Sequence, residues 1–175
     1  RFKYWAPMLF LGREVSGKTL GIVGMGSIGK AVARRANAFD MRILYHNRKR
    51  VPPDEEQTLA ATFADLKTLL AESDFVSLHV PLTEESRYLI RGPELALMKP
   101  TAFLINTARG PVVDEQALVE TLKAGKIAGA GLDVYENEPL LCPGLAELDN
   151  AIVLPHVGSA TVETRVRIGT LAVEN

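Results

Sequence analysis

The chain has 175 residues, of which 47% are hydrophobic and 23% charged, and its formal net charge is −1. This composition predicts one globular domain that buries roughly 70% of the surface exposed by the unfolded chain, and the near-neutral charge argues against a nucleic-acid partner. The single cysteine, Cys142, excludes a disulfide within the chain. No apolar run is long enough for a membrane span, and no secretory signal is recognisable. We therefore expect a cytoplasmic protein.

The first predicted unit is a strand followed by a glycine turn and a helix. Residues 19–23 form a mainly apolar run, and Gly24, Gly26 and Gly29 follow with G-x-G-x-x-G spacing. The first glycine permits a tight turn, the second lets the backbone approach a pyrophosphate, and the third lets the helix pack closely on the strand. Free N–H groups at the start of the helix would bind the phosphates. The motif predicts a dinucleotide site, and the alternative is an ordinary glycine turn.

The helix is predicted to continue to about residue 40. It carries apolar residues at helical spacing, which we expect to face the sheet: Ile28, Val32, Ala36 and Phe39. A second strand over 43–45 would complete a strand–helix–strand unit.

The residues after this second strand bear on the choice of cofactor. Sites for NAD usually place an acid about 20 residues beyond the glycines, on the ribose 2′-hydroxyl, whereas an arginine there accommodates a 2′-phosphate. This window contains no acid and reads His46, Asn47, Arg48, Lys49 and Arg50. Arginine suits a phosphate because it donates forked hydrogen bonds. The turn therefore favours NADP(H), with NAD(H) possible if the cations form only a solvated turn.

Helical and strand patterns alternate through the rest of the chain, which predicts a Rossmann-type, doubly wound parallel sheet in three layers. Strands are expected at 75–80, 102–105, 128–132 and 152–154. Helices are expected over 63–70, from Pro93, and from a cap at Asp114 to about Gly125. His79, inside one of these strands, is expected to be a hydrogen-bonded core residue.

Three polar residues, Arg109, Asp133 and His156, each follow a different predicted strand, at the sheet edge where open parallel sheets bind ligands. A protonated imidazole there can give a proton to a keto oxygen as hydride arrives at the carbon. A carboxylate beside it, for which we favour Glu138 over the nearby Glu136, would favour the imidazolium and fix the ring. An arginine could bind a substrate carboxylate through two hydrogen bonds. No metal site is expected.

Several blocks resemble the cofactor domain of the D-2-hydroxyacid dehydrogenases: 24–29, 106–110, 131–134 with 138–139, and 155–161. The resemblance runs from about Gly17 to the C-terminus, with glyoxylate and hydroxypyruvate reductases as the nearest relatives. It implies hydride transfer between nicotinamide C4 and C2 of a 2-oxo acid. Arg109 would bind this small-molecule substrate, Glu138 would be the acidic partner, and His156 would be the acid/base. A homodimer formed through the cofactor domains is also implied.

The expected cofactor contacts combine the two sequence motifs with positions that the resemblance implies. They are Gly24, Gly26, Ser27, Ile28 and Gly29 around the pyrophosphate; Asn47, Arg48 and Lys49 in the basic turn; Val80, Pro81 and Ser86 on the adenine and ribose side; Thr107 and Ala108 near the nicotinamide ribose; Asp133 at the carboxamide; and Arg109, His156 and Gly158.

Members of this family carry a second domain built from segments before and after the cofactor domain. We therefore expect residues 1–16 to be a truncated interdomain segment, 17–160 the dinucleotide-binding domain, and 161–175 the start of a helix leading to an absent substrate domain. We expect such a fragment to bind the cofactor without catalysing steady turnover of the substrate. The alternatives are a dinucleotide-sensing corepressor of the same fold, an NAD-dependent phosphoglycerate dehydrogenase, or a free-standing binding domain.

Overall fold

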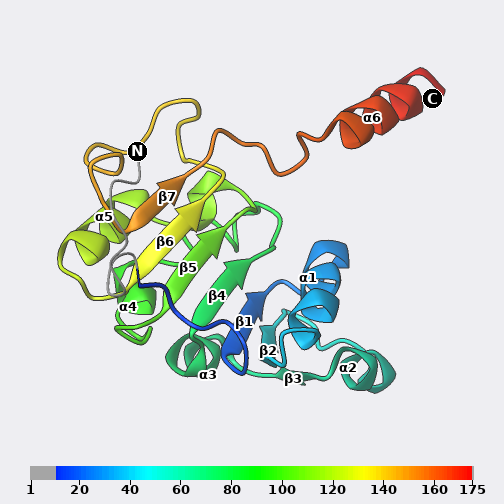
Figure 1. Ribbon diagram of the computed structural model, residues 1–175, viewed down its shortest axis with the longest axis horizontal. Helices are drawn as coiled ribbons and strands as arrows, with labels where there is room; N and C mark the ends of the chain where they lie inside the picture. The colour runs from blue at the N-terminus through cyan, green and yellow to red at the C-terminus, as the bar shows by residue number, and fades with distance from the viewer. Residues whose placement is uncertain (1–10, 175) are drawn as a thin grey trace.

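The computed structural model describes residues 11–174, so the predictions for residues 1–10 lie outside the described part (Figure 1). A seven-stranded sheet has the order β3-β2-β1-β4-β5-β6-β7, and every neighbouring pair is parallel. The strands are β1 Thr19–Val23, β2 Arg42–His46, β3 Ala61–Phe63, β4 Phe75–Leu78, β5 Phe103–Asn106, β6 Gly129–Leu132 and β7 Ala151–Val153. The predicted Rossmann-type fold is confirmed.

The helices are α1 Ser27–Asn37, α2 Pro53–Leu59, α3 Leu66–Glu72, α4 Gly92–Leu95, α5 Glu115–Lys123 and α6 Val162–Glu174, with a 3-10 turn at Gly110–Val112. Asp65 and Asp114 cap α3 and α5, each by accepting a hydrogen bond from a backbone N–H three residues later. None of the helices within residues 11–174 is both long and apolar enough to cross a membrane.

Two hydrophobic clusters lie on opposite faces of the sheet. In β2, Leu44 belongs to the larger cluster, whereas Ile43 and Tyr45 belong to the smaller one. Successive side chains of a strand point to opposite faces, so the two clusters are separated by the sheet. The smaller cluster packs under α1, and the larger one packs under α5. We call them the α1 core and the α5 core.

The strand order reverses between β1 and β4, because the chain proceeds from β1 outward to β3 and then returns to the other side of β1. At such a switch point the loops after the two central strands diverge and leave a crevice at their carboxyl ends. The glycine turn follows β1, at this crevice.

Three local expectations were wrong. The sequence reading missed α2 and β3, and Phe63 lies in β3 rather than in a helix. Strand β4 ends at Leu78, two residues before the predicted end. On α1, the buried residues are Gly29, Ala33 and Ala36, whereas Ile28 and Phe39 are 64% and 55% exposed. Small residues on the buried side let the helix lie close to the sheet.

Beyond β7 the chain leaves the sheet and forms α6, which extends away from the domain in Figure 1. Its described residues include no buried side chain. A helix was expected in this region, and the division of the chain at 17–160 stays a prediction.

Candidate cofactor and active site

A cavity of about 520 Å³ opens at the carboxyl ends of β1, β4 and β5. This volume lies within the usual range for small-molecule sites. Eight residues expected at the cofactor line it, together with His79 and Leu82: Gly26, Ser27, Ile28, Val80, Pro81, Thr107, Ala108 and Arg109. The exposure of Ile28 follows from this position at the cavity rather than against the sheet.

The glycine turn has the geometry that a dinucleotide requires. Gly24 has a φ of 103°, and a β-carbon there would lie 2.7 Å from the backbone carbon of His79. A β-carbon on Gly29 would overlap the carbonyl oxygen of Gly24, whereas Gly26 faces open space. Within residues 11–174 no side chain caps α1, which leaves its first N–H groups available to an anion. These residues fit the pyrophosphate of a nicotinamide dinucleotide.

The basic turn after β2 divides into parts with different partners. Asn47 accepts a 2.6 Å hydrogen bond from the N–H of Met25 and so fastens the glycine turn. Arg50 donates two 2.7 Å hydrogen bonds to the carboxylate of Glu56. The prediction that three consecutive cations face a phosphate is therefore corrected for Arg50, which Glu56 engages from within the turn. All three side chains are exposed, and Arg48 pairs with Glu85 at 2.6 Å.

The Arg50–Glu56 pair is part of a network that includes Tyr45. The buried Tyr45 hydroxyl donates to Glu56 and accepts from the N–H of Val51 at 3.1 Å. Hydrogen bonds from Arg50 and Tyr45 lower the pKa of Glu56 to about 2. Burial and the Glu56 carboxylate raise the pKa of Tyr45 to about 12. The network fixes the far side of the basic turn.

Two residues in the loop after β4 make contacts that bear on their expected roles. His79 lies just beyond the strand and lines the cavity, and its Nε2 is 2.9 Å from the Ser77 hydroxyl. Burial lowers the pKa of its imidazole. Ser86, expected beside the adenine and ribose, is only 8% exposed and lies outside the cavity lining. Its hydroxyl donates to the Pro81 carbonyl and accepts from the Thr83 N–H, so Ser86 shapes the loop.

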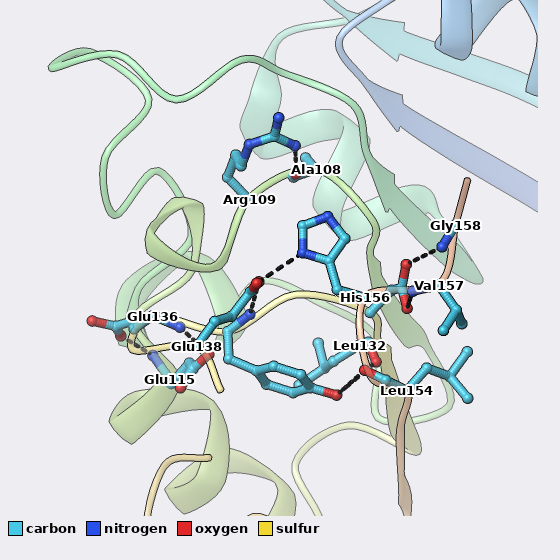
Figure 2. A network of polar contacts seen from close by, with 12 residues as sticks. Ala108, Arg109, Glu115, Leu132, Glu136, Glu138, Leu154, His156, Val157 and Gly158 are labelled. Carbon is cyan, nitrogen blue, oxygen red and sulfur yellow. Dashed lines mark hydrogen bonds and ion pairs between the residues drawn. The ribbon is translucent and has the colours of Figure 1, made fainter. Parts of the chain in front are cut away.

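Outside the cavity lining, the structure brings together Glu138 and His156. Glu138 Oε2 lies 2.8 Å from His156 Nδ1, and Glu138 Oε1 accepts from the N–H of Tyr135 at 3.1 Å. The hydrogen bond with His156 holds the pKa of the Glu138 carboxyl below its ordinary value, and the charge of Arg109 acts in the same direction. Figure 2 shows these side chains together, with the imidazole contacted through Nδ1, which leaves Nε2 for a substrate.

Asp133 holds the backbone that directly follows His156. Its two carboxylate oxygens accept 2.7 Å hydrogen bonds from the N–H groups of Val157 and Gly158 (Figure 2). His156 itself has a φ of 54°, a left-handed conformation that L-residues rarely adopt and that tends to occur at functional sites. Asp133, expected at the nicotinamide carboxamide, thus also holds the turn that presents the imidazole.

Arg109 stands on a turn organised by Asn106, which is 1% exposed at the end of β5. The Asn106 side chain accepts from the N–H of Ala108 and donates to the carbonyl of Arg109, both at 3.0 Å. The guanidinium donates to the Ala108 carbonyl at 2.6 Å. Arg109 is otherwise exposed at the cavity, where an anionic ligand can reach it.

Glu136, the alternative to Glu138 in the sequence, pairs instead with Glu115, a residue that the sequence did not point to. Glu136 Oε1 accepts from the N–H of Glu115 at 2.8 Å, and Glu115 Oε1 accepts from the N–H of Glu136 at 2.7 Å (Figure 2). Tyr88 donates to the second oxygen of Glu136 at 2.8 Å. Burial raises the pKa of the Glu115 carboxyl. Glu136 therefore stabilises the loop through these hydrogen bonds, and Glu138 is the carboxylate that contacts the imidazole of His156.

The arrangement offers a cationic group, an imidazole in contact with a carboxylate, and a cavity beside the glycine turn at the same sheet edge. Within residues 11–174 there is no cluster of three or more His, Cys, Asp or Glu residues that could hold a metal ion.

Residues 1–158 match the family described as "D-isomer specific 2-hydroxyacid dehydrogenase, NAD binding domain". Glyoxylate reductase from Thermococcus litoralis is 54% identical over 171 residues, which cover 98% of this chain and 51% of that protein. The structure of a glyoxylate reductase from Paecilomyes thermophila has a TM-score of 0.90 and 48% identity, covering 98% of this chain and 52% of that one.

An acyclic imino acid reductase solved with NADPH and D-Arg has a TM-score of 0.87 and 35% identity, and the match covers 98% of this chain and 53% of that one. The chain thus spans about half the length of the relatives it matches.

Proposed function

The chain belongs to the D-isomer-specific 2-hydroxyacid dehydrogenase family through its NAD-binding domain, and we propose that the protein transfers a hydride between a nicotinamide dinucleotide and a 2-oxo or 2-hydroxy acid, with glyoxylate or hydroxypyruvate as substrate. The observation that carries the proposal is the 2.8 Å contact between His156 and Glu138, close enough to Arg109 for its charge to act on Glu138, while Arg109 lines the cavity at the glycine turn.

Each side chain has a distinct role in this proposal. The cofactor supplies or accepts the hydride. Arg109 binds the substrate carboxylate through its guanidinium, which is permanently charged. His156 gives a proton from Nε2 to the keto oxygen as negative charge develops there. Glu138 accepts from Nδ1–H, which fixes the tautomer and stabilises the imidazolium that the reduction requires.

We further propose a preference for NADP(H). Arg48 and Lys49 are exposed cations of the basic turn that Glu56 does not engage, and an arginine there suits a 2′-phosphate. The relative solved with NADPH supports this choice, whereas the matched family domain is described as NAD-binding. NAD(H) is therefore the alternative.

The test is a titration of the 175-residue chain with NADPH and with NADH, following the nicotinamide emission. NADPH should bind at least tenfold tighter, a difference of about 1.4 kcal/mol. Arg48→Gln should remove most of this preference. Equal or tighter binding of NADH would contradict the NADP(H) proposal, and a chain that binds neither cofactor would contradict dinucleotide binding itself.

Turnover is tested separately. The full-length enzyme should reduce glyoxylate or hydroxypyruvate, whereas we expect the 175-residue chain to bind cofactor without steady turnover, because substrate orientation and water exclusion need the second domain. Steady glyoxylate reduction by the 175-residue chain would contradict that expectation.

A homodimer in the cytoplasm completes the proposal. The edge strand β7 and the segment after it expose apolar side chains, including Ile152 at 68% and Leu154 at 45%. The single cysteine, Cys142, can form no disulfide within the chain, and a reducing cytoplasm is the compartment that we propose. Light scattering of the purified chain should give twice the monomer mass, and a monomer at micromolar concentration would contradict the dimer.

A further inference from the structure

An ion pair spans the glycine turn. Arg48 Nη1 lies 2.6 Å from Glu85 Oε2. Arg48 follows β2, Glu85 lies in the loop after β4, and β1 separates these two strands in the sheet. The pair therefore crosses the carboxyl end of β1, where the chain turns at the glycines.

The loop that carries Glu85 is held in place from within. The neighbouring Ser86 is buried and uses its hydroxyl to join the Pro81 carbonyl to the Thr83 N–H. The N–H of Arg87 donates to the Thr83 carbonyl at 2.9 Å. The backbone around Glu85 is thus held in place, while its side chain is 71% exposed.

We propose that Glu85 is a specificity-determining residue for the cofactor, an inference that rests on the proposed dinucleotide function. The turn after β2 lacks the acid that usually accepts a hydrogen bond from the ribose 2′-hydroxyl of NAD. Glu85 supplies a carboxylate to the same place from a loop 37 residues further along the chain. With NADH it is the acceptor for the 2′-hydroxyl. With NADPH it repels the 2′-phosphate and competes with it for Arg48.

The exposure of Arg48 and Glu85 limits how strongly Glu85 can affect cofactor preference. Arg48 is 80% exposed, so its pair with Glu85 is weak and exchanges with solvent and other anions. A doubly charged phosphate can displace one carboxylate from the guanidinium, but the displaced charge stays close by. Glu85 therefore reduces the factor by which NADPH binds more tightly than NADH, without making NADH the preferred cofactor.

The experiment compares the 175-residue chain with Glu85→Gln and with Glu84→Gln, which removes an equal charge from the exposed residue one position earlier. Dissociation constants for NADPH and NADH are measured for each by nicotinamide emission. E85Q should tighten NADPH at least threefold and leave NADH unchanged or weaker, so the NADPH/NADH preference rises at least threefold. E84Q should leave the preference unchanged. In the Arg48→Gln background, the gain from E85Q should fall to less than half.

The outcomes separate the inference from the function on which it rests. Binding of both cofactors with an unaltered preference in E85Q overturns the role of Glu85 and leaves dinucleotide binding intact. An equal rise in E84Q also overturns it, since a diffuse loss of negative charge then explains the result. A parent chain that binds neither cofactor overturns the proposed function and this inference together. Raising the salt concentration should shrink the E85Q effect, because the charges are exposed.

Discussion

Gly110 and Tyr135 are packed backbone against backbone, so closely that a β-carbon on Gly110 would overlap the carbonyl group of Tyr135. Gly110 directly follows Arg109, and the Tyr135 N–H holds the carboxylate of Glu138. The contact therefore joins the turn after β5 to the loop after β6 and sets the spacing between the cation and the carboxylate of the candidate active site.

Replacing Gly110 by alanine should destabilise the domain by about 2–3 kcal/mol, because the overlap involves backbone that cannot rotate away. The measurement is the free energy of unfolding from urea titration. Gly131→Ala is the matched control, since a β-carbon there has no neighbour within 4 Å in the described residues. Similar losses in both variants would show that the close approach is not the cause.

Glu138→Gln should lower kcat of the full-length enzyme by about a hundredfold, because acid/base catalysis by a positioned imidazole contributes roughly 10²–10⁴ and the amide no longer stabilises the imidazolium. Steady-state kinetics with glyoxylate and NADPH measure the effect. The KM for NADPH should change little. Glu147→Gln, at an exposed position, is the control and should retain kcat. A wild-type kcat in E138Q would remove Glu138 from the mechanism.

Glu115→Ala should lower kcat about tenfold, since the Glu136 N–H then loses its partner and the loop bearing Glu138 is less well held. Glu115→Gln should retain most of kcat. Its amide oxygen can still accept that hydrogen bond, and burial already disfavours the charge of this carboxyl by raising its pKa.

Kinetics and thermal melting should be measured on both Glu115 variants. If the two lose kcat equally, or if only the melting temperature falls, Glu115 serves stability alone and not the position of Glu138.

The Glu56–Arg50 pair predicts a pH dependence of stability. The pKa of Glu56 falls from 4.5 to about 2 in the folded protein, so the folded state binds this proton more weakly than the unfolded state. The stabilisation is complete above about pH 4.5 and is lost as the pH falls towards 2. Glu56→Gln should therefore melt below the parent protein at pH 7, and the difference should close between pH 4.5 and 2.

Thermal melts across this range, followed by circular dichroism, are the measurement. Asp54→Asn changes an exposed acid in the same turn of α2 and should show a much smaller difference at every pH. A difference between Glu56→Gln and the parent that persists unchanged to pH 2 would rule out the ionised pair as its source.

The sequence predicted the sheet and its carboxyl edge because six of its strands carry apolar runs bounded by turn residues. It did not reveal β3, which has three residues, or α2, whose composition is mostly polar. The signal for α2 was present nonetheless: Pro53 followed by Asp54, Glu55 and Glu56 is typical of a helix start, where proline fits and acids favour the dipole.

The residues around the candidate site were harder to find when their contacts are distant in sequence. Glu85 reaches Arg48 across 37 residues, and Glu115 reaches Glu136 across 21. Neither contact is associated with a periodicity or a motif spacing in the sequence from which it could be predicted. Glu138 and His156 were predicted to meet because each follows a parallel strand, and the structure places them in contact.

The two cores described above lie beneath different parts of the candidate site. Tyr45 and Val51, which hold the basic turn, belong to the α1 core, whereas Ala108 and Tyr135, next to the acid/base residues, belong to the α5 core. Substitutions in the basic turn are therefore expected to strain the α1 core, whereas substitutions beside Arg109 and Glu138 strain the α5 core. A sequence with this architecture can therefore vary its basic turn without repacking the core beside Arg109.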